Sequence, residues 1–532
     1  FAANPDCTKM TAVAGQHDKY WNSLVQVQET NDQNVYIGVA TSRENTIQSG
    51  ALMRVDVRGA TDPSVTSEET PNFDVLTPGV PLDDSPSPTN VGRYRSPYVL
   101  PDGRILVSWA RGFVNDLDEM SQSAPDFGLY IYNTDTHQNE LVVNYEDSWE
   151  LDGRPVLPRT EPPILASVQT SDDASLPVKI GSIDVKSTSL FTLHQNTVSG
   201  AQFDNTHLDD ALRSAKRVRI IEGFSSEGAP GVTMFGLTMA EGAAMLGEAK
   251  VREDGSWLAE IPPYVPVHLQ PIDQFDMMIR SQTTWIQGMP GESRVCGGCH
   301  EERTKTFTPS DELLTVAAAS PESFMQPVSD RQEYPWANAH DDKKANEIQA
   351  LLTEKCSSCH NETMNGNVPQ ETYTITKTDA ETGAQTVYQL PRLDLSDRPI
   401  TVTYDRKVAS WPASYVSLFY PASLEMDMSM GVALTSGTKP PTWARPSDAR
   451  NSALIEKLNI TSEDDDTVTA WPLGGKFSDA TIKAHGDAGR TLHPEDVGGS
   501  LTREQRVMLI RAIDMGGQYY SRQNTDFVPM VR

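Results

Sequence analysis

Short apolar runs with polar residues at alternate positions dominate the first 165 residues of the chain. A period of two is typical of strands with one buried face, and Pro101-Asp102-Gly103 is a turn signal between two of these runs. One propeller blade takes about 40 residues, so the region has room for about four blades, complete or partial. The pattern therefore predicts a β-propeller-like domain over residues 1–165. The expected strands are residues 34–40, 51–57, 103–109, 128–132 and 140–143.

A second group of strand-like runs follows a proline-rich segment, residues 155–163. Proline clusters of this kind are typical of a linker at a domain edge. The runs beyond it predict a β-sandwich-like middle domain over residues 166–325. The expected strands are residues 218–222, 251–257 and 265–270, followed by a hairpin of residues 277–279 and 283–286.

Helical spacing replaces the alternation in residues 326–532. Apolar residues three and four positions apart end directly at Cys356, and residues 452–458 predict a short helix. Thr502 and Gln505 have the spacing of a capping box and precede another apolar stripe. We therefore expect a mainly β protein with α-helices, whose third domain is helical and cytochrome c-like.

Two Cys-x-x-Cys-His motifs use four of the five cysteines. Random order of 5 Cys and 10 His in 532 residues predicts roughly 0.001 such motifs. The two thiols add to the vinyl groups of a porphyrin, and the histidine lies beneath its iron. A Cys₄ zinc knot and a thioredoxin-like redox pair are the alternatives, and both leave the histidines unexplained. We expect two covalently attached haem c groups, at Cys296, Cys299 and His300 and at Cys356, Cys359 and His360.

A low-spin electron-transfer haem needs a second axial ligand, normally His or Met. For the second motif we expect His493, which lies in a loop directly before the capped helix. His485 is the competing histidine, although its Gly and Asp neighbours indicate an exposed turn. A methionine run could supply a sulfur ligand or pack against the haem. Its members are Met426, Met428 and Met430.

The sixth ligand of the first haem stays open. The candidates are His17, His268 and His340, of which His268 lies on the strand before the motif and could equally be a core residue. Without any of them the iron is five-coordinate and open to catalysis. Cys7 is the fifth cysteine, and it could form a disulfide, bind a metal ion such as zinc or be inert.

The net charge of the chain is −29, from 73 acidic and 44 basic residues. Such a surface disfavours nucleic acid and anionic membranes as partners and favours basic ones. No apolar run approaches the roughly 20 residues of a membrane-spanning helix. The acidic run of residues 463–466 predicts a solvated loop, with a calcium site as the alternative.

Covalent haem attachment takes place outside the cytoplasm, so the two motifs predict a periplasmic or extracellular protein. The sequence begins at Phe1 and shows no signal peptide. This start is what we expect of a mature or truncated form.

Several segments carry a resemblance to a known family. They are residues 98–104, 125–130, 254–256, 261–262, 280–281, 290–292 and 453–455, with His493 and residues 513–514. In this order they resemble the family related to the hydrazine synthase alpha subunit, over nearly the whole chain. The resemblance implies a propeller-like domain, a β-rich middle domain with one haem and a C-terminal domain with a bis-histidine haem. It also implies that His360 and His493 are the ligands of that second haem.

The resemblance carries a difference at the first motif. In the synthase, a tyrosine four residues after the motif histidine binds the iron, and that histidine helps to bind zinc. The corresponding residue here is Thr304, which has no phenolate. His300 is therefore free to bind the iron, and synthase chemistry is not implied. A zinc site of Cys7, His17 and a carboxylate stays open, and the synthase works with partner subunits.

We expect an exported dihaem c-type cytochrome that transfers electrons to and from redox partner proteins. One alternative is a haem enzyme that acts on a small nitrogen species or peroxide at the first haem. Another is a haem-bearing structural subunit of a larger or polymeric electron-conducting assembly. A homo- or hetero-oligomer is compatible with each.

Overall fold

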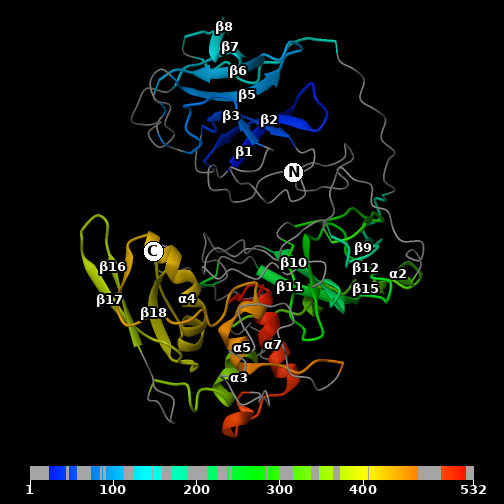
Figure 1. Cartoon of the computed structure of the whole chain (residues 1–532), viewed down its shortest axis with the longest axis vertical. Helices are drawn as coiled ribbons and strands as arrows, with labels where there is room; N and C mark the ends of the chain where they lie inside the picture. The colour runs from blue at the N-terminus through cyan, green and yellow to red at the C-terminus, as the bar shows by residue number, and fades with distance from the viewer. Residues whose placement is uncertain are drawn as a thin grey trace. The chain divides into compact units, whose positions relative to one another are not determined.

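The computed structural model divides the chain into two compact units (Figure 1). The described residues of unit 1 lie between Ser23 and Pro158, and those of unit 2 between Thr170 and Arg522. The three-domain division made from the sequence stays a prediction. The structure describes residues 23–42, 47–56, 73–83, 85, 87, 91–112, 125–146, 148–158, 170–188, 212–224, 236–238, 242–282, 285–299, 316–336, 347–362, 372–404, 407–464 and 493–522.

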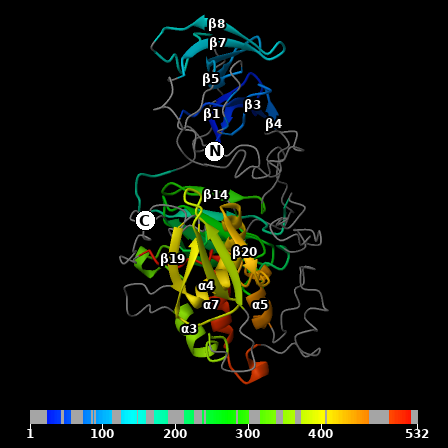
Figure 2. The ribbon, with the colours of Figure 1, turned by 90° about the vertical axis from the view of Figure 1, so that its left-hand side faces the viewer.

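Unit 1 contains two four-stranded antiparallel sheets, each with its strands in sequence order. Side chains of both, including Val39, Leu52, Ile105 and Val107, form one core. Of the roughly four predicted blades, the described residues form these two sheets and no closed propeller. The strands are β1 (Ser23–Glu29), β2 (Val35–Thr41), β3 (Ala51–Asp56), β4 (Phe73–Val75), β5 (Arg93–Val99), β6 (Ile105–Ala110), β7 (Phe127–Asn133) and β8 (Gln138–Val143), of which β5, β7 and β8 are labelled at one end of Figure 2.

The sequence pattern missed β1 and β5 because a bulge interrupts the alternation in each. Gln26 and Ser96 have positive φ angles of 53° and 49°, and the pairing register shifts beside both. A bulge adds one residue and moves every later side chain to the opposite face of its strand. The predicted turn between β5 and β6 is confirmed, since Gly103 has a φ of 87° and its N–H donates to the Leu100 carbonyl.

The middle part of the chain, which lies in unit 2, consists of two sheets that share a core containing Ile180, Ile220 and Trp257. One has the order β11-β10-β13 and the other the order β14-β9-β12-β15. The strands are β9 (Val178–Ser182), β10 (Arg217–Phe224), β11 (Gly242–Lys250), β12 (Trp257–Ile261), β13 (Val267–Ile272), β14 (Ser293–Cys296) and β15 (Glu322–Ser323). Short helices α2 (Val316–Ala319) and η2 (Val328–Asp330) follow.

Two predictions for this region are wrong. The strand expected over residues 251–257 begins only at Trp257, because Gly255, with a φ of 85°, lies in a turn. The hairpin expected over residues 277–286 is absent from the described residues. Met278 and Ile286 instead form isolated bridges to β13, because β13 is an edge strand of its sheet with unpaired backbone groups on one side.

The C-terminal part packs around the buried helix α4 (Ala413–Ser429), beside β16, β17 and β18 in Figure 1. The sequence prediction missed α4, since residues 413–420 are all buried and show no polar face. Pro421 inside the helix also indicated a break. The other elements are α3 (Glu347–Lys355), β16 (Thr372–Thr378), β17 (Gln385–Pro391), β18 (Pro399–Tyr404), β19 (Lys407–Pro412), β20 (Val432–Ser436), η4 (Ala449–Asn451), α5 (Ala453–Leu458), η5 (Glu495–Val497) and α7 (Arg503–Asp514). Among the described residues, no helix has both the length and the apolar character that crossing a membrane requires.

The capping box predicted at the start of α7 is confirmed, with Thr502 and Gln505 each bonding the backbone of the other. Replacing Thr502 with Ala should lower the free energy of unfolding by about 1 kcal/mol, because one helix N–H loses its acceptor. Urea unfolding measures the change. Thr502→Ser keeps the hydroxyl, so an equal loss in that variant would contradict the explanation.

Candidate functional site

The second Cys-x-x-Cys-His motif continues directly from helix α3, as the sequence predicted. The N–H of Cys356 donates to the Leu352 carbonyl, and the N–H groups of Cys359 and His360 donate to the carbonyl of Cys356 at 3.1 and 2.9 Å. The loop is thus a tight turn that keeps both thiols on one short segment. Cys356 is half-buried and Cys359 is exposed. Burial, with a smaller contribution from Cys359, raises the pKa of the Cys356 thiol to about 11.

The structure brings His360 and His493 together, although they are far apart in the sequence. Their ring centres lie 6.4 Å apart and the ring planes meet at 72°. A metal–imidazole bond of about 2.0 Å plus about 1.1 Å from nitrogen to ring centre, taken on both sides, gives roughly 6.2 Å. The two imidazoles therefore have the separation of a pair that shares one metal ion.

The electrostatic setting keeps His360 available as a ligand. Burial, and to a smaller extent the nearby His493, lowers the pKa of His360. Its Nδ1 is buried and has no hydrogen-bond partner among the described residues. On the other side, the Nδ1 of His493 lies 2.8 Å from Oδ1 of Asp496. Because Nδ1 of His493 is held by a carboxylate, its Nε2 carries the free lone pair.

Arg506 of α7 holds the loop that carries His493. Its side chain is 2% exposed. Its Nη2 donates to the His493 carbonyl at 2.7 Å and to a carboxylate oxygen of Glu495 at 2.6 Å. Nε donates to the Asn459 carbonyl at 3.2 Å, and Nη1 to the carbonyl of Leu501. One buried guanidinium thus fixes the position of the ligand loop relative to the helix.

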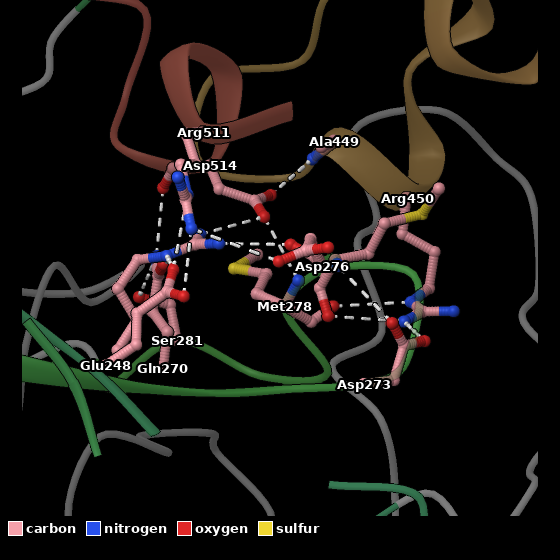
Figure 3. A network of polar contacts seen from close by, with 12 residues as sticks. Glu248, Gln270, Asp273, Asp276, Met278, Ser281, Ala449, Arg450, Arg511 and Asp514 are labelled. Atoms are coloured by element: carbon pink, nitrogen blue, oxygen red, sulfur yellow. Dashed lines mark hydrogen bonds and ion pairs between the residues drawn. The ribbon is translucent and has the colours of Figure 1, made fainter. Parts of the chain in front are cut away.

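Helix α7 is itself fixed on the sheet β11-β10-β13 by a buried ionic network (Figure 3). Arg219 of β10 is fully buried and contacts Glu248 at 2.9 Å and Asp514 at 3.3 Å. Arg511 also pairs with Glu248, at 2.9 Å. Gln270 of β13 donates to the Asp514 carbonyl at 2.9 Å. The network therefore connects the middle sheet to the helix that positions His493.

The first motif begins on β-structure, as predicted. Strand β14 ends at Cys296 and pairs in parallel with β9. The carbonyls of Cys296 and Gly297 accept from the N–H groups of residues 183 and 184, and the N–H of Cys299 donates to the Ser187 carbonyl at 2.7 Å. The loop is therefore anchored on its neighbour. His300 and Thr304 lie outside the described residues.

His268 is separated from this loop by a sheet. Val267 and Leu269 contact the same core as Cys299, and alternation along β13 places His268 on the opposite face. There its ring stacks on Trp285 with centres 4.5 Å apart. Burial lowers the pKa of His268 to about 4, and Nε2 has no partner among the described residues. The structure does not bring this histidine and Cys299 together.

The remaining candidates of the sequence prediction divide into two groups. Met428 and Met430 lie at the end of α4 and are 46% and 36% exposed, so neither packs in a pocket. Met426 lies in the same part of the helix. No cluster of three or more metal-ligating residues occurs in the described ranges. Glu463 and Asp464 of the acidic run pair with Arg217 and Lys216. Outside the described residues lie Cys7, His17, His340 and His485.

Sequence reasoning missed Asp496 and Arg506. The spacing of Asp496 three residues after His493 was a usable signal, since a carboxylate commonly orients a ligating histidine. Arg506 gave no comparable signal. Besides the Glu495 carboxylate, its partners are backbone carbonyls of three separate segments, which only folding brings together.

Comparison with known proteins relates the chain to one family. Residues 183–301 match the family described as hydrazine synthase alpha subunit middle domain. This range contains Cys296 and Cys299. The curated hydrazine synthase subunit alpha of Kuenenia stuttgartiensis is 26% identical over 251 residues, a match that covers 39% of this chain and 28% of that protein.

A solved structure shares the fold. Kuenenia stuttgartiensis hydrazine synthase aligns with 95% of this chain and 63% of that chain, with a TM-score of 0.58 and 18% identity. The chain thus spans less than two thirds of either relative. It is related to the hydrazine synthase alpha subunit family, which confirms the resemblance found in the sequence.

Proposed function

We propose that the chain is an exported c-type cytochrome that carries two covalently attached haems and transfers electrons. The observation that carries the proposal is that the ring centres of His360 and His493 lie 6.4 Å apart beside a Cys-x-x-Cys turn. The groups that one haem c requires of a protein meet there: two cysteine thiols, a proximal nitrogen and a distal nitrogen. Val497, 68% exposed and four residues after His493, is an apolar side chain of the kind that a porphyrin face would cover.

A bound haem supplies a reversible one-electron couple whose potential follows from its axial ligands and surroundings. The residues do the rest. The thiols of Cys356 and Cys359 would form the two covalent bonds to its vinyl groups. His360 and His493 would each donate a nitrogen to its iron, which would exclude exogenous ligands. Arg506 would keep the His493 loop in place through its bonds to the His493 carbonyl and Glu495.

At the first motif, Cys296, Cys299 and His300 would attach the other haem. Val295, 48% exposed beside the exposed Cys296, is a second apolar side chain that a porphyrin would cover. His268 lies on the far face of the sheet, so His17 and His340 are the remaining histidine candidates for the sixth position.

A second candidate function is a haem enzyme that acts on a small nitrogen species or peroxide at the first haem. The relation to a hydrazine synthase subunit favours it. Thr304 instead of a tyrosine separates this chain from synthase chemistry. Cyanide or nitric oxide binding to a high-spin ferric haem in the purified protein would support the enzyme, whereas two fully low-spin haems would exclude it.

We place the protein in the periplasm or outside the cell, because that is where haem c is attached. Its net charge of −29 suits a basic redox partner. A haem-bearing subunit of a larger assembly is the alternative, and native mass measurement of the purified protein tests it.

Haem counting tests the proposal directly. Protein expressed with a c-type maturation system should contain two haems per chain, measured by pyridine haemochrome absorbance and intact mass. The double variants Cys356→Ser/Cys359→Ser and Cys296→Ser/Cys299→Ser should each retain one. Cys7→Ser is the matched control and should retain both. Zinc in place of haem at either motif, detected by metal analysis, would disprove the proposal.

A further inference from the structure

We propose that Asp496 is a positioning residue that lowers the reduction potential of the second haem through His493. The inference rests on the proposed function, because it requires a haem between His360 and His493. It goes beyond that function by assigning a role to a carboxylate that does not contact the cofactor.

The contact between the two side chains is short and direct. Oδ1 of Asp496 lies 2.8 Å from Nδ1 of His493, within one turn of chain. A carboxylate at Nδ1 accepts a hydrogen bond from the Nδ1–H group, fixes the tautomer that leaves Nε2 unprotonated, and makes the imidazole a stronger donor. A stronger donor stabilises ferric iron more than ferrous iron, and the potential falls.

The negative charge of Asp496 acts mainly on His493. Among the described residues, Asp496 forms no ion pair with a Lys or Arg side chain. Its neighbour Glu495 is different, because it pairs with Arg506 at 2.6 Å. Arg506 therefore neutralises one of the two adjacent carboxylates and leaves the other to act on His493.

The geometry is also held from the other side. Arg506 donates to the His493 carbonyl, and the N–H of Leu501 donates to Glu495 at 2.7 Å. The segment that contains the His493–Asp496 pair is thus bonded to α7 at His493 and to the residue before the N-cap of α7 at Glu495. The pair is about one-third exposed, and these backbone contacts keep it assembled in spite of that exposure.

His360 and His493 differ in the hydrogen bonding of their Nδ1 atoms. The Nδ1 of His360 is buried without a hydrogen-bond partner among the described residues, so this imidazole receives no comparable assistance. The reduction potential is therefore adjusted through His493, the ligand that is not next to the haem-binding cysteines. The same hydrogen bond that lowers the potential therefore also holds the more easily lost ligand.

Redox titration of the holoprotein with Asp496→Asn tests the inference. Asn keeps an acceptor oxygen but removes the charge. We expect the ferric/ferrous equilibrium of the bis-histidine haem to shift about tenfold toward ferrous, which equals the lower end of the changes in metal affinity that follow the loss of such an orienting group. For one electron this is a rise of about 59 mV. The low-spin spectrum should persist.

The control is Glu362→Gln, which removes an exposed acid two residues from His360 that does not contact either ring. An equal shift in both variants would overturn the inference, since general surface charge would then account for it. Loss of the low-spin spectrum in Asp496→Asn would also overturn it, because Asp496 would then be needed for ligation and not for tuning. A failure of the proposed function is distinct, since no haem would be attached at Cys356 and Cys359.

A second variant tests the support of the pair. Arg506→Gln should loosen the loop, so that a fraction of the haem becomes high-spin and binds carbon monoxide when reduced. Arg506→Lys keeps the charge beside Glu495 and should restore part of the low-spin signal. A fully low-spin spectrum with an unchanged potential in Arg506→Gln would contradict the positioning by Arg506.

Discussion

Replacing Glu248 with Gln is expected to lower the free energy of unfolding of unit 2 by about 3 kcal/mol at pH 7. Glu248 lies on β11 with its side chain 10% exposed, and it pairs with Arg217, Arg219 and Arg511 at 2.9–3.3 Å. Removing one carboxylate leaves three guanidinium groups with less compensation. A buried charge that loses its partner costs more than a surface pair contributes.

The pKa of Glu248 reflects the attraction of its three arginine neighbours. Burial alone would raise it, but the charges of Arg219, Arg511 and Arg217 together lower it to about 2 from 4.5. At about 1.36 kcal/mol per pKa unit, this difference corresponds to about 3 kcal/mol. This energy describes the attraction between one anion and three cations.

The loss of stability in Glu248→Gln should depend on pH. A depressed folded-state pKa contributes stability that is present above pH 4.5 and disappears as pH falls toward 2. The difference between wild type and Glu248→Gln should therefore shrink by about 1 kcal/mol between pH 7 and pH 4. Asp514 contributes with the opposite sign. Burial raises its pKa to about 6, so its contribution becomes less favourable as pH rises from 3.8 toward 6.

Urea unfolding at both pH values, followed by circular dichroism, measures these differences. Glu253→Gln is the matched control, because Glu253 lies in an exposed turn after the same strand. It should change the stability by no more than about 0.5 kcal/mol. A loss in Glu248→Gln that is no larger than in the control would show that the three arginines are compensated by other groups.

Local signals in the sequence predicted the parts of the site that lie next to each other in the chain. The helix that ends directly before Cys356 and the capping box at Thr502 each depend on a few consecutive residues, and the structure contains both. The choice of His493 over His485 rested on its place before that helix. The structure places His493 beside His360.

Other features could not be predicted from the sequence, because they depend on contacts with distant parts of the chain. Residues 413–420 of helix α4 are buried on all sides, so this part of the sequence carries no helical period. The pairing of Arg219 with Asp514 joins residues of two separate sequence regions. In a sequence both residues resemble ordinary surface charges, and only the packing of α7 on β10 makes them a buried pair.

Replacing His493 with Ala is expected to change the second haem most. The iron would lose its only untethered ligand, and the ferric spectrum should change from low-spin to high-spin, with carbon monoxide bound after reduction. His493→Met should stay low-spin with a raised potential, because a thioether favours ferrous iron. Electron paramagnetic resonance and absorbance spectra of the holoprotein measure both.

The matched control is His268→Ala. His268 is another histidine of unit 2, but it stacks on Trp285 on the face of β13 opposite the core that Cys299 contacts. The variant should leave both haem spectra unchanged. A high-spin first haem in His268→Ala would show that this residue reaches the first iron after all. An unchanged second haem in His493→Ala would mean that another side chain fills the position. Because His360 and His493 already stand at the spacing of a shared metal ion, we expect that position to belong to His493.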